Sequence, residues 1–358
     1  MKLSDIKVSE KDLVDFTNYQ KTLFFSKIDG GYPVGIMDSR KVQHHEDIKK
    51  IFKEKLAKET TEITELARRT LHYVYRVKTG DGAYIIRINA ASMFYKELQF
   101  YIELFAMEEL EKRNITHLKI YDIDTSRSLV DYDFEIMDVV SGDSVRDLSG
   151  KEAVPPALFE KIGVYMAGVH TIQTSGYGPF NIEKILKGQG VGVHEEWGEY
   201  LTINVDKHLE YTVMAELLTV AEADAVKDVL AILAGLQVEQ PVFLHGSIAN
   251  RNIFSQNGEV SGVIDWEDGV SGDPVFDLSF FGAGCYGHEE WYVSFMEGYK
   301  KVSSLPDDYE KRFWAYYLRV SIAKAITRIR FKTVKDMVLP DVKGRILFGL
   351  SKLSALVL

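Results

Sequence analysis

The chain has 358 residues, of which 46% are hydrophobic and 27% charged. These values exclude a disordered, collagen-like or coiled-coil chain and predict a globular protein of about two domains. The 53 acidic residues outnumber the 43 basic ones, so the formal net charge is −10. This charge argues against nucleic acid or an anionic membrane surface as a partner, and it would attract a cationic small molecule.

The cysteine content and the first residues indicate the cellular compartment. The only cysteine, Cys285, excludes an internal disulfide and a cysteine-rich zinc site. The chain opens with charged residues where a secretory signal would have its apolar stretch, and it contains no run of about 18 apolar residues. We therefore expect a cytoplasmic protein, and we leave monomer and dimer open.

Residues 1–60 are expected to form a partly helical N-terminal extension. The clearest signal in it is a lysine-rich stretch from Glu46 to Ala57. Its apolar positions recur at spacings of three and four, as one buried face of a helix requires; they are Ile48, Ile51, Phe52 and Leu56. The role of the extension stays open: it packs on the next lobe or mediates dimerisation.

Residues 61–141 predict a compact α+β lobe. The β-rich runs 73–77 and 83–88 flank a polar turn with glycines and indicate a hairpin. A helix follows from Met93 to Glu111, because its apolar residues form one stripe. A second hairpin is predicted from Leu118 to Val140, with its turn near residues 126–128.

Residues 142–358 predict a larger, mainly helical lobe. One helix is expected around residues 158–169, and the stretch from Val213 to Leu236 predicts either a pair of helices or one long helix. The exception is residues 241–281, where short apolar runs alternate with glycine and acidic residues. Catalytic groups commonly lie on loops of this kind, held by a rigid frame.

Within residues 241–281, a polar loop lies between short apolar strands. His245, Gly246 and Ser247 follow one strand, Asn252 precedes the next, and Asp265 follows the third. Asn252 and Asp265 therefore fall at corresponding ends of two strands that we expect to pair. An Asn oxygen and an Asp oxygen placed there could share one hard cation.

This arrangement resembles the catalytic and metal-binding loops of the aminoglycoside phosphotransferase and choline kinase-like family. The family pattern H-G-D-x-x-x-x-N is matched at His245, Gly246 and Asn252, and the triplet 264–266 reads Ile-Asp-Trp. Gly272-Asp273-Pro274 with Asp277-Leu278 matches G-D-P-x-x-D-L. Residues 83–97 and 174–180 are also similar to the hygromycin B phosphotransferases of the family. The resemblance covers about residues 62–300.

The resemblance implies a protein kinase-like fold with a small β-rich nucleotide lobe and a larger, mainly helical lobe. It implies ATP or GTP and Mg²⁺ as cofactors, with the phosphates near Arg87. Glu97 would pair with that arginine from the following helix. The backbone of residues 136–140, including Met137 and Val139, would contact the purine. Asn252 and Asp265 would hold the Mg²⁺, and His245 would brace the loop rather than transfer protons.

Two departures from the family pattern are evident. Ser247 stands where the family has its catalytic aspartate, and a neutral serine hydroxyl cannot serve as that base. Loss of a general base typically costs about 10²–10⁴-fold in rate. The serine could be an engineered substitution, a natural change that gives a pseudokinase, or a sign that a neighbouring carboxylate such as Asp268 has taken the role. The phosphate-covering turn, 67–72, also has no glycine, although Arg68 or Arg69 could contact phosphates.

The resemblance thus implies a kinase that transfers the ATP γ-phosphoryl group to a hydroxyl of a cationic small molecule, most plausibly an aminoglycoside-type antibiotic. Two alternatives stay open: a pseudokinase or binding protein without turnover, and a kinase for choline, a sugar or another metabolite. Acidic residues of the helical lobe could bind substrate amines or simply be solvated; they are Glu195, Glu196, Glu199, Glu289 and Glu290.

Overall fold

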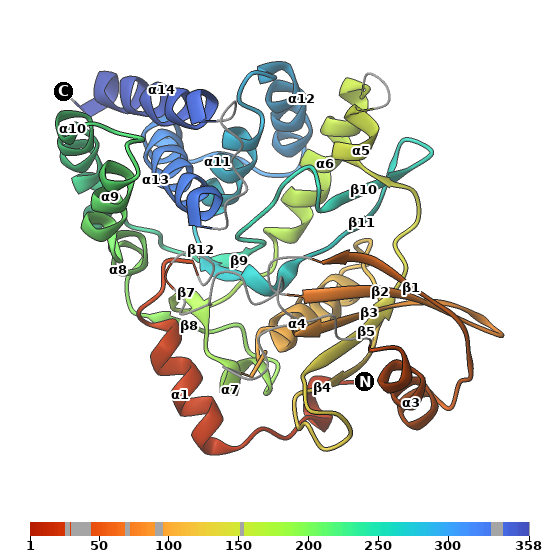
Figure 1. Ribbon diagram of the computed structural model, residues 1–358. Coiled ribbons are helices and arrows are strands. Elements are labelled where there is room, and N and C mark those ends of the chain that lie inside the picture. The colour runs from red at the N-terminus through yellow and green to blue at the C-terminus, as the bar shows by residue number, and fades with distance from the viewer. Residues whose placement is uncertain are drawn as a thin grey trace.

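The computed structural model describes residues 1–25, 29, 44–68, 72–89, 96–150, 154–330 and 339–357. It contains a smaller lobe built on one sheet and a larger helical lobe (Figure 1), which confirms the predicted α+β, two-lobed architecture. No helix in the described part of the chain is long and apolar enough to cross a membrane.

Five antiparallel strands form the sheet of the smaller lobe, in the order β1-β2-β3-β5-β4. They are β1 (Thr60–Arg68), β2 (His72–Thr79), β3 (Gly82–Asn89), β4 (Ile120–Asp124) and β5 (Phe134–Asp138). Strands β2 and β3 pair with each other, as do β4 and β5. Both predicted hairpins are therefore confirmed.

Two helices pack on this sheet. Helix α3 (His45–Leu56) buries Ile48, Ile51 and Phe52 against one face, which confirms the helix predicted there. On the other side lies α4 (Phe100–Lys112), between the sheet and the helical lobe (Figure 1). The prediction had this helix begin at Met93. Residues 90–95 lie outside the described part of the chain, and 96–99 are not helical.

The helical lobe is assembled mainly around α13, which packs on α11 and on α14, and around the pair α6 and α12. Its helices are α5 (Val145–Ser149), α6 (Pro156–Val169), α7 (Ile182–Ile185), α8 (Trp197–Thr202), α9 (Val205–Met214), α10 (Val220–Leu230), α11 (Pro274–Gly284), α12 (Glu289–Lys300), α13 (Tyr309–Arg330) and α14 (Leu339–Val357).

Of the two alternatives for residues 213–236, one long helix is wrong, and the segment contains more than one helix. Helix α9 ends at Met214, α10 begins at Val220, and the 3₁₀ helix η3 (Ala231–Gly235) follows. The break contains Glu216, whose φ of +57° is incompatible with a continuing right-handed helix. Thr219 then starts α10 with a capping box.

Short strands frame the site in the helical lobe. Strands β6 (Asp143–Ser144), β10 (Ile253–Gln256) and β11 (Glu259–Val263) form one small sheet. A second contains β7 (Tyr177–Phe180), β8 (Gly192–His194), β9 (Val242–Leu244) and β12 (Val270–Gly272). Both the loop from β9 to β10 and the loop from β11 to β12 face the smaller lobe (Figure 1).

The N-terminal extension contacts both lobes. Its first turn, η1 (Leu3–Asp5), packs on α4, and α1 (Glu10–Gln20) packs on α7. The chain then enters the helical lobe, where Phe24 is fully buried. The Arg319 guanidinium lies 3.5 Å from the centre of the Phe24 ring, and Tyr200 donates a hydrogen bond to the Phe24 carbonyl. The extension therefore crosses from one lobe to the other (red to orange in Figure 1).

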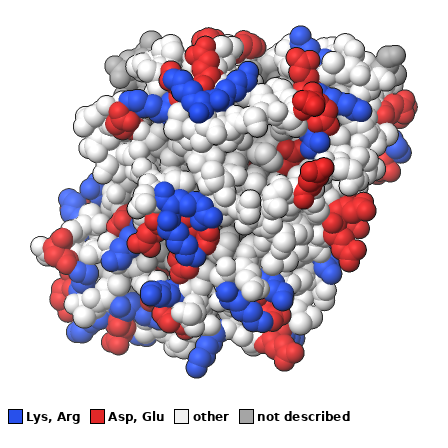
Figure 2. All heavy atoms as spheres, turned by 180° about the vertical axis from the view of Figure 1, so that it is seen from behind, with Lys and Arg blue, Asp and Glu red and all other residues white. Residues whose placement is uncertain are grey.

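Charge on the surface is mixed. On the face seen in Figure 2, Lys and Arg side chains lie among Asp and Glu side chains, with uncharged areas between them. This face has no continuous basic surface over the described residues, and such a surface is what binding to a phosphate backbone requires.

Candidate active site

The loop after β9 is fixed by one buried carboxylate. Asp277 of α11 accepts hydrogen bonds from the backbone N–H groups of His245, at 2.7 Å, and Gly246, at 2.9 Å. His170 contacts the same carboxylate at 3.3 Å. Gly246 has a φ of +75°, and a Cβ added to it would lie 2.1 Å from the Asp268 carbonyl oxygen. Only glycine fits this position, for both reasons.

The His245 ring links this loop to the next strand. Its Nδ1 accepts from the Ser247 backbone N–H at 3.3 Å, so its Nε2 carries the proton and donates to the Ile264 carbonyl at 3.1 Å. Burial lowers the pKa of His245, which favours this neutral form. The ring also packs on Trp266, with 4.6 Å between centroids. These contacts suit a brace better than a proton-transfer group.

Asn252 and Asp265 lie side by side. Strands β10 and β11 pair antiparallel, with Ile253 opposite Val263, and the Ile264 N–H donates to the Asn252 carbonyl. The Asn252 side-chain amide donates to Asp265 Oδ2 at 3.2 Å. Asp265 has a φ of +72°, which is uncommon for a residue with a side chain and is often found at functional sites.

The oxygen ligands available here suit Mg²⁺. That ion is commonly held by one or two protein side chains together with substrate phosphates. Among the described residues, no group of three or more His, Cys, Asp or Glu side chains is arranged to hold a metal ion. Asn252 and Asp265 thus fit a metal that shares its coordination with a nucleotide, and they do not form a complete protein cage.

Ser247 is buried at the end of the same loop, with its hydroxyl 3.5 Å from His245 Nδ1. That distance is at the outer limit for a hydrogen bond. Because burial lowers the pKa of the imidazole, His245 is a weak base toward this hydroxyl. The structure therefore brings together Ser247, His245, Asn252 and Asp265 in one pair of adjacent loops.

The predicted pairing of Arg87 with Glu97 is wrong. Arg87 Nη1 donates to Glu103 of α4 at 2.7 Å, and Nη2 donates to Glu267, two residues after Asp265. The physical reason is that α4 begins at Phe100, so Glu97 lies ahead of the helix and cannot project from it. Glu97 instead lies 3.6 Å from His72 Nε2.

Further carboxylates surround Arg87. Glu135 stands directly opposite Arg87 on β5, and its Oε2 lies 3.6 Å from Nη1. Burial raises the pKa of Glu135 well above its ordinary value, and the Glu103 carboxylate raises it further. Burial alone would lower the pKa of Arg87, but the charges of Glu103, Glu267 and Glu135 outweigh it and raise that pKa. We call Arg87, Glu97, Glu103, Glu135 and Glu267 the acidic cluster.

The acidic cluster joins the two lobes. Arg87 belongs to the sheet, Glu103 to α4 and Glu267 to the 3₁₀ helix η4 (Trp266–Asp268) of the helical lobe. Gln99 adds a second contact, because its side chain donates to the Glu267 carbonyl at 3.1 Å. The loop that carries Asp265 is therefore held directly against the smaller lobe.

The predicted purine-contacting segment follows β5. Met137 is buried within the strand and has partners on both sides, Ile85 and Ile120. Val139 lies one residue beyond the strand end, and its backbone makes no hydrogen bond within the described residues. Of the two, Val139 has the free backbone that a purine edge needs. The turn 69–71 and the side chain of Arg68 lie outside the described residues.

The acidic residues singled out in the helical lobe are exposed. Glu196 and Glu199 form the capping box of α8, which is a structural role.

Sequence reasoning missed Glu103 and Glu267 as partners of Arg87. Glu103 could have been proposed as the partner of Arg87 because it lies inside the helix, on the turn that faces the sheet. Glu267 could have been proposed because it directly follows Asp265-Trp266.

Comparisons with known proteins agree with this geometry. The model of the phosphotransferase enzyme family matches residues 62–313. Hygromycin-B 4-O-kinase from Escherichia coli is 25% identical over 225 residues, a match that spans 61% of this chain and 61% of that relative's own length.

Solved structures establish the fold. An aminoglycoside phosphotransferase, APH(4)-Ia, in ternary complex with ADP and hygromycin B has a TM-score of 0.66 at 17% identity, covering 86% of this chain and 98% of its own. A candidate fructosamine-3-kinase from Thermobifida fusca has a TM-score of 0.59 at 17% identity, covering 84% and 98%. The predicted protein kinase-like fold is confirmed, and the chain belongs to the phosphotransferase enzyme family.

Proposed function

We propose that this protein transfers the γ-phosphoryl group of ATP to a hydroxyl of a cationic small molecule, most plausibly an aminoglycoside-type compound, in the cytoplasm. The observation that carries the proposal is the contact between Asn252 and Asp265 beside the Ser247 loop. The E. coli relative is named for phosphorylating hygromycin B, and the net charge of −10 would attract a polyamine.

The chain's own residues would contribute mainly positioning, which is what phosphoryl transfer requires most. Asn252 and Asp265 would hold Mg²⁺, and the bound ion would neutralise charge on the phosphates. The Val139 backbone would receive the purine. Both Nη groups of Arg87 are bound to carboxylates, so a contact with phosphate requires its pair with Glu267 to open.

The proposal still requires a general base, because Ser247 cannot serve as one. Asp268 belongs to the segment next to this loop, because its backbone packs against Gly246, and its side chain is largely buried. Asp268 is therefore our candidate for the group that accepts the proton of the substrate hydroxyl. The second candidate function is a binding protein without turnover, and the neutral hydroxyl of Ser247 is the observation that favours it.

Calorimetric titration of ATP into the protein, with and without Mg²⁺, tests the nucleotide site. Tighter binding with Mg²⁺ supports the proposal, and absence of binding with both ATP and GTP would refute it. ADP release with hygromycin B as acceptor then separates the candidates. Turnover by the natural chain that is lost in Asp268→Asn supports Asp268 as base. Turnover that appears only in Ser247→Asp supports the binding protein.

A further inference from the structure

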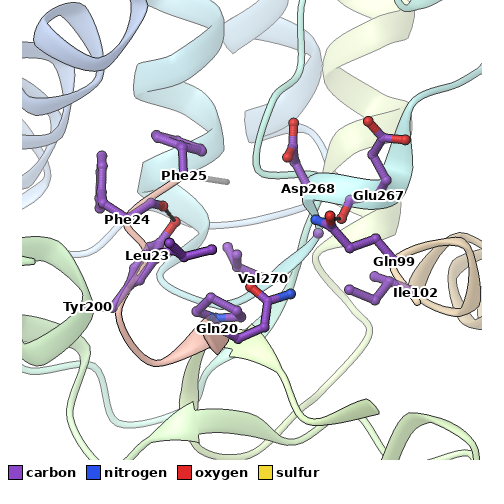
Figure 3. A pocket seen from close by; sticks show the side chains of 12 residues that line it. Gln20, Leu23, Phe24, Phe25, Gln99, Ile102, Tyr200, Glu267, Asp268 and Val270 are labelled. Carbon is purple, nitrogen blue, oxygen red and sulfur yellow. Dashed lines mark hydrogen bonds between the residues drawn. The ribbon is translucent and has the colours of Figure 1, made fainter. Parts of the chain in front are cut away.

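The hollow beside the N-terminal extension is too small to receive an acceptor. Phe24 and Tyr200 line one side of it, and Asp268 lies on the other (Figure 3). Its cavity volume is about 20 Å³, which is room for one water molecule. Recognition of an acceptor therefore depends on other surroundings of the catalytic loop, residues 245–252, and the helices of the larger lobe approach that loop.

Four cationic side chains gather where α13 and α14 approach the catalytic loop. Arg251 is exposed on the loop itself. Lys324 and Arg328 are half-buried on one face of α13, and Arg345 of α14 is 8% exposed. We call Arg251, Lys324, Arg328 and Arg345 the basic cluster. Such a grouping is unusual in a chain whose net charge is −10.

Helix α11 connects the basic cluster to the catalytic loop. Its Asp277 holds the loop backbone, and Lys324 donates to the carbonyl of Phe280, about one turn further along, at 2.9 Å. The Lys324 ammonium also lies 4.0 Å from the centre of the Phe280 ring and 3.8 Å from the position of a Cβ on Gly284. One helical turn advances about 5.4 Å, so the ammonium is held close behind the loop.

Arg345 contributes an unsatisfied donor. Its Nε–H group is buried and has no hydrogen-bond partner in the described residues, and its guanidinium lies 5.7 Å from the centre of the Tyr286 ring. The buried hydroxyls of Tyr317 and Ser321 also have no partner within the described part of the chain. Both stand on the same face of α13 as Lys324, at spacings of four and three. Because buried polar groups without partners are rare, these indicate a polar ligand.

Three members of the basic cluster, Arg251, Lys324 and Arg345, form no ion pair with the acidic side chains that the structure describes. Burial and the charges of Arg345 and Arg251 lower the pKa of Lys324. Burial and the charge of Arg328 lower the pKa of Arg345, and the exposed carboxylate of Asp341 does not reverse that shift. The like charges thus oppose one another, and a bound anion would remove this cost.

We propose that the basic cluster is a binding site for an oxyanion, either a carboxylate or a phosphate group. Guanidinium and ammonium groups suit both, because their hydrogen bonds to oxyanions are short and strong. The nucleotide phosphates are expected near Asp265, toward the smaller lobe, so this oxyanion is a second one: a substituent of the acceptor or free phosphate. The inference rests on the proposed function for its place beside the acceptor. An acceptor bound in this way would carry an acid group in addition to the amine proposed above.

The test is calorimetric titration of inorganic phosphate, glucose 6-phosphate and glucuronate into the full-length protein saturated with Mg²⁺ and the ATP analogue AMP-PNP, with glucose as the uncharged comparison. The analogue fills the position of the γ-phosphate, so a further phosphate must bind elsewhere. Arg251→Gln and Lys324→Met each remove one cation, and Lys311→Gln, at an exposed position of α13, is the matched control. AMP-PNP binding and thermal unfolding are measured for every variant.

We expect at least one of the three anions to bind at least tenfold more tightly than glucose. Each substitution in the cluster should weaken that binding about tenfold, as expected for a hydrogen bond between charged groups, while Lys311→Gln should not change it. Inorganic phosphate that binds as tightly as the sugar anions would identify a free anion as the ligand. Binding of the sugar anions alone would identify a substituent of the acceptor.

Two results would overturn the inference: no binding of any of the three anions to a protein that binds Mg²⁺ and AMP-PNP, or equal affinity in Arg251→Gln, Lys324→Met and the unmodified protein. The phosphotransferase proposal would survive either result. Failure of Mg²⁺ and AMP-PNP to bind would refute the phosphotransferase proposal itself, and the anion titrations, repeated without nucleotide, would still test the basic cluster.

Discussion

The buried carboxyl of Glu135 should make the stability of this protein depend on pH in an unusual direction. The side chain is fully buried, and neither of its oxygens has a hydrogen-bond partner in the described residues. Burial and the nearby Glu103 raise the pKa of Glu135 well above 4.5. The folded protein therefore holds a proton here at pH values where the unfolded chain has released it.

The sign and size of the effect follow from proton linkage. A group whose pKa is raised by folding contributes stability that is complete below its unfolded value. This stability is lost as the pH rises toward the folded value. For one proton the free energy of unfolding falls by at most about 1.4 kcal/mol per pH unit. In Glu135→Gln that loss is absent, because the amide has the shape of the neutral acid and no charge to bury.

Urea unfolding of the natural protein and of Glu135→Gln at pH 5, 6, 7 and 8 measures this difference. The two free energies should be similar near pH 5, and the variant should become progressively more stable as the pH rises. Glu195→Gln, at an exposed position, is the control and should change stability by less than about 0.5 kcal/mol at every pH. Parallel curves for Glu135→Gln and the natural protein would refute the reasoning, and so would a variant that is less stable at pH 8.

Three further substitutions test the site. Asp265→Asn should remove the Mg²⁺-dependent gain in ATP affinity, about tenfold or more, while leaving the melting temperature near that of the natural protein; an unchanged gain in calorimetry would exclude Asp265 as a metal ligand. Gly246→Ala forces a Cβ to within 2.1 Å of the Asp268 carbonyl, and displacement of the loop by about 1 Å should lower turnover about 100-fold; activity within threefold would contradict this. Phe24→Ala should reduce stability by about 3–5 kcal/mol, because the ring is fully buried against Tyr200 and Arg319; a loss below 1 kcal/mol in urea unfolding would show that the extension is not anchored there.

The sequence was sufficient where local pattern and fixed spacing agreed. Strand alternation predicted both hairpins of the smaller lobe, and the match from His245 to Asp277 predicted the two loops that the structure brings together. Asn252 and Asp265 could be expected to meet because paired antiparallel strands place their ends side by side. Such inferences need only neighbours within one short segment.

Sequence reasoning failed where the outcome depended on a contact between distant elements. Glu97 and Glu103 both follow Arg87 at a distance compatible with one helix, and only the helix start at Phe100 decides which of them faces the sheet. No local pattern indicates that start, because the N-cap residue Gln99 makes no side-chain cap hydrogen bond. The pairing of Glu267 with Arg87 could not be predicted either, because it requires the two lobes to be docked.

The N-terminal extension is the strongest case of this kind. Its composition is polar and mixed, and no pattern in it predicts that Phe24 lies in the core of a lobe that begins more than 100 residues later. The structure buries that ring because Arg319 and Tyr200 offer it a cation and an aromatic face. With Phe24 anchored in the helical lobe and η1 packed on α4, the extension contacts both lobes. The extension is therefore held to the helical lobe by this ring, which is why Phe24→Ala should lower the free energy of unfolding and not merely loosen the chain end.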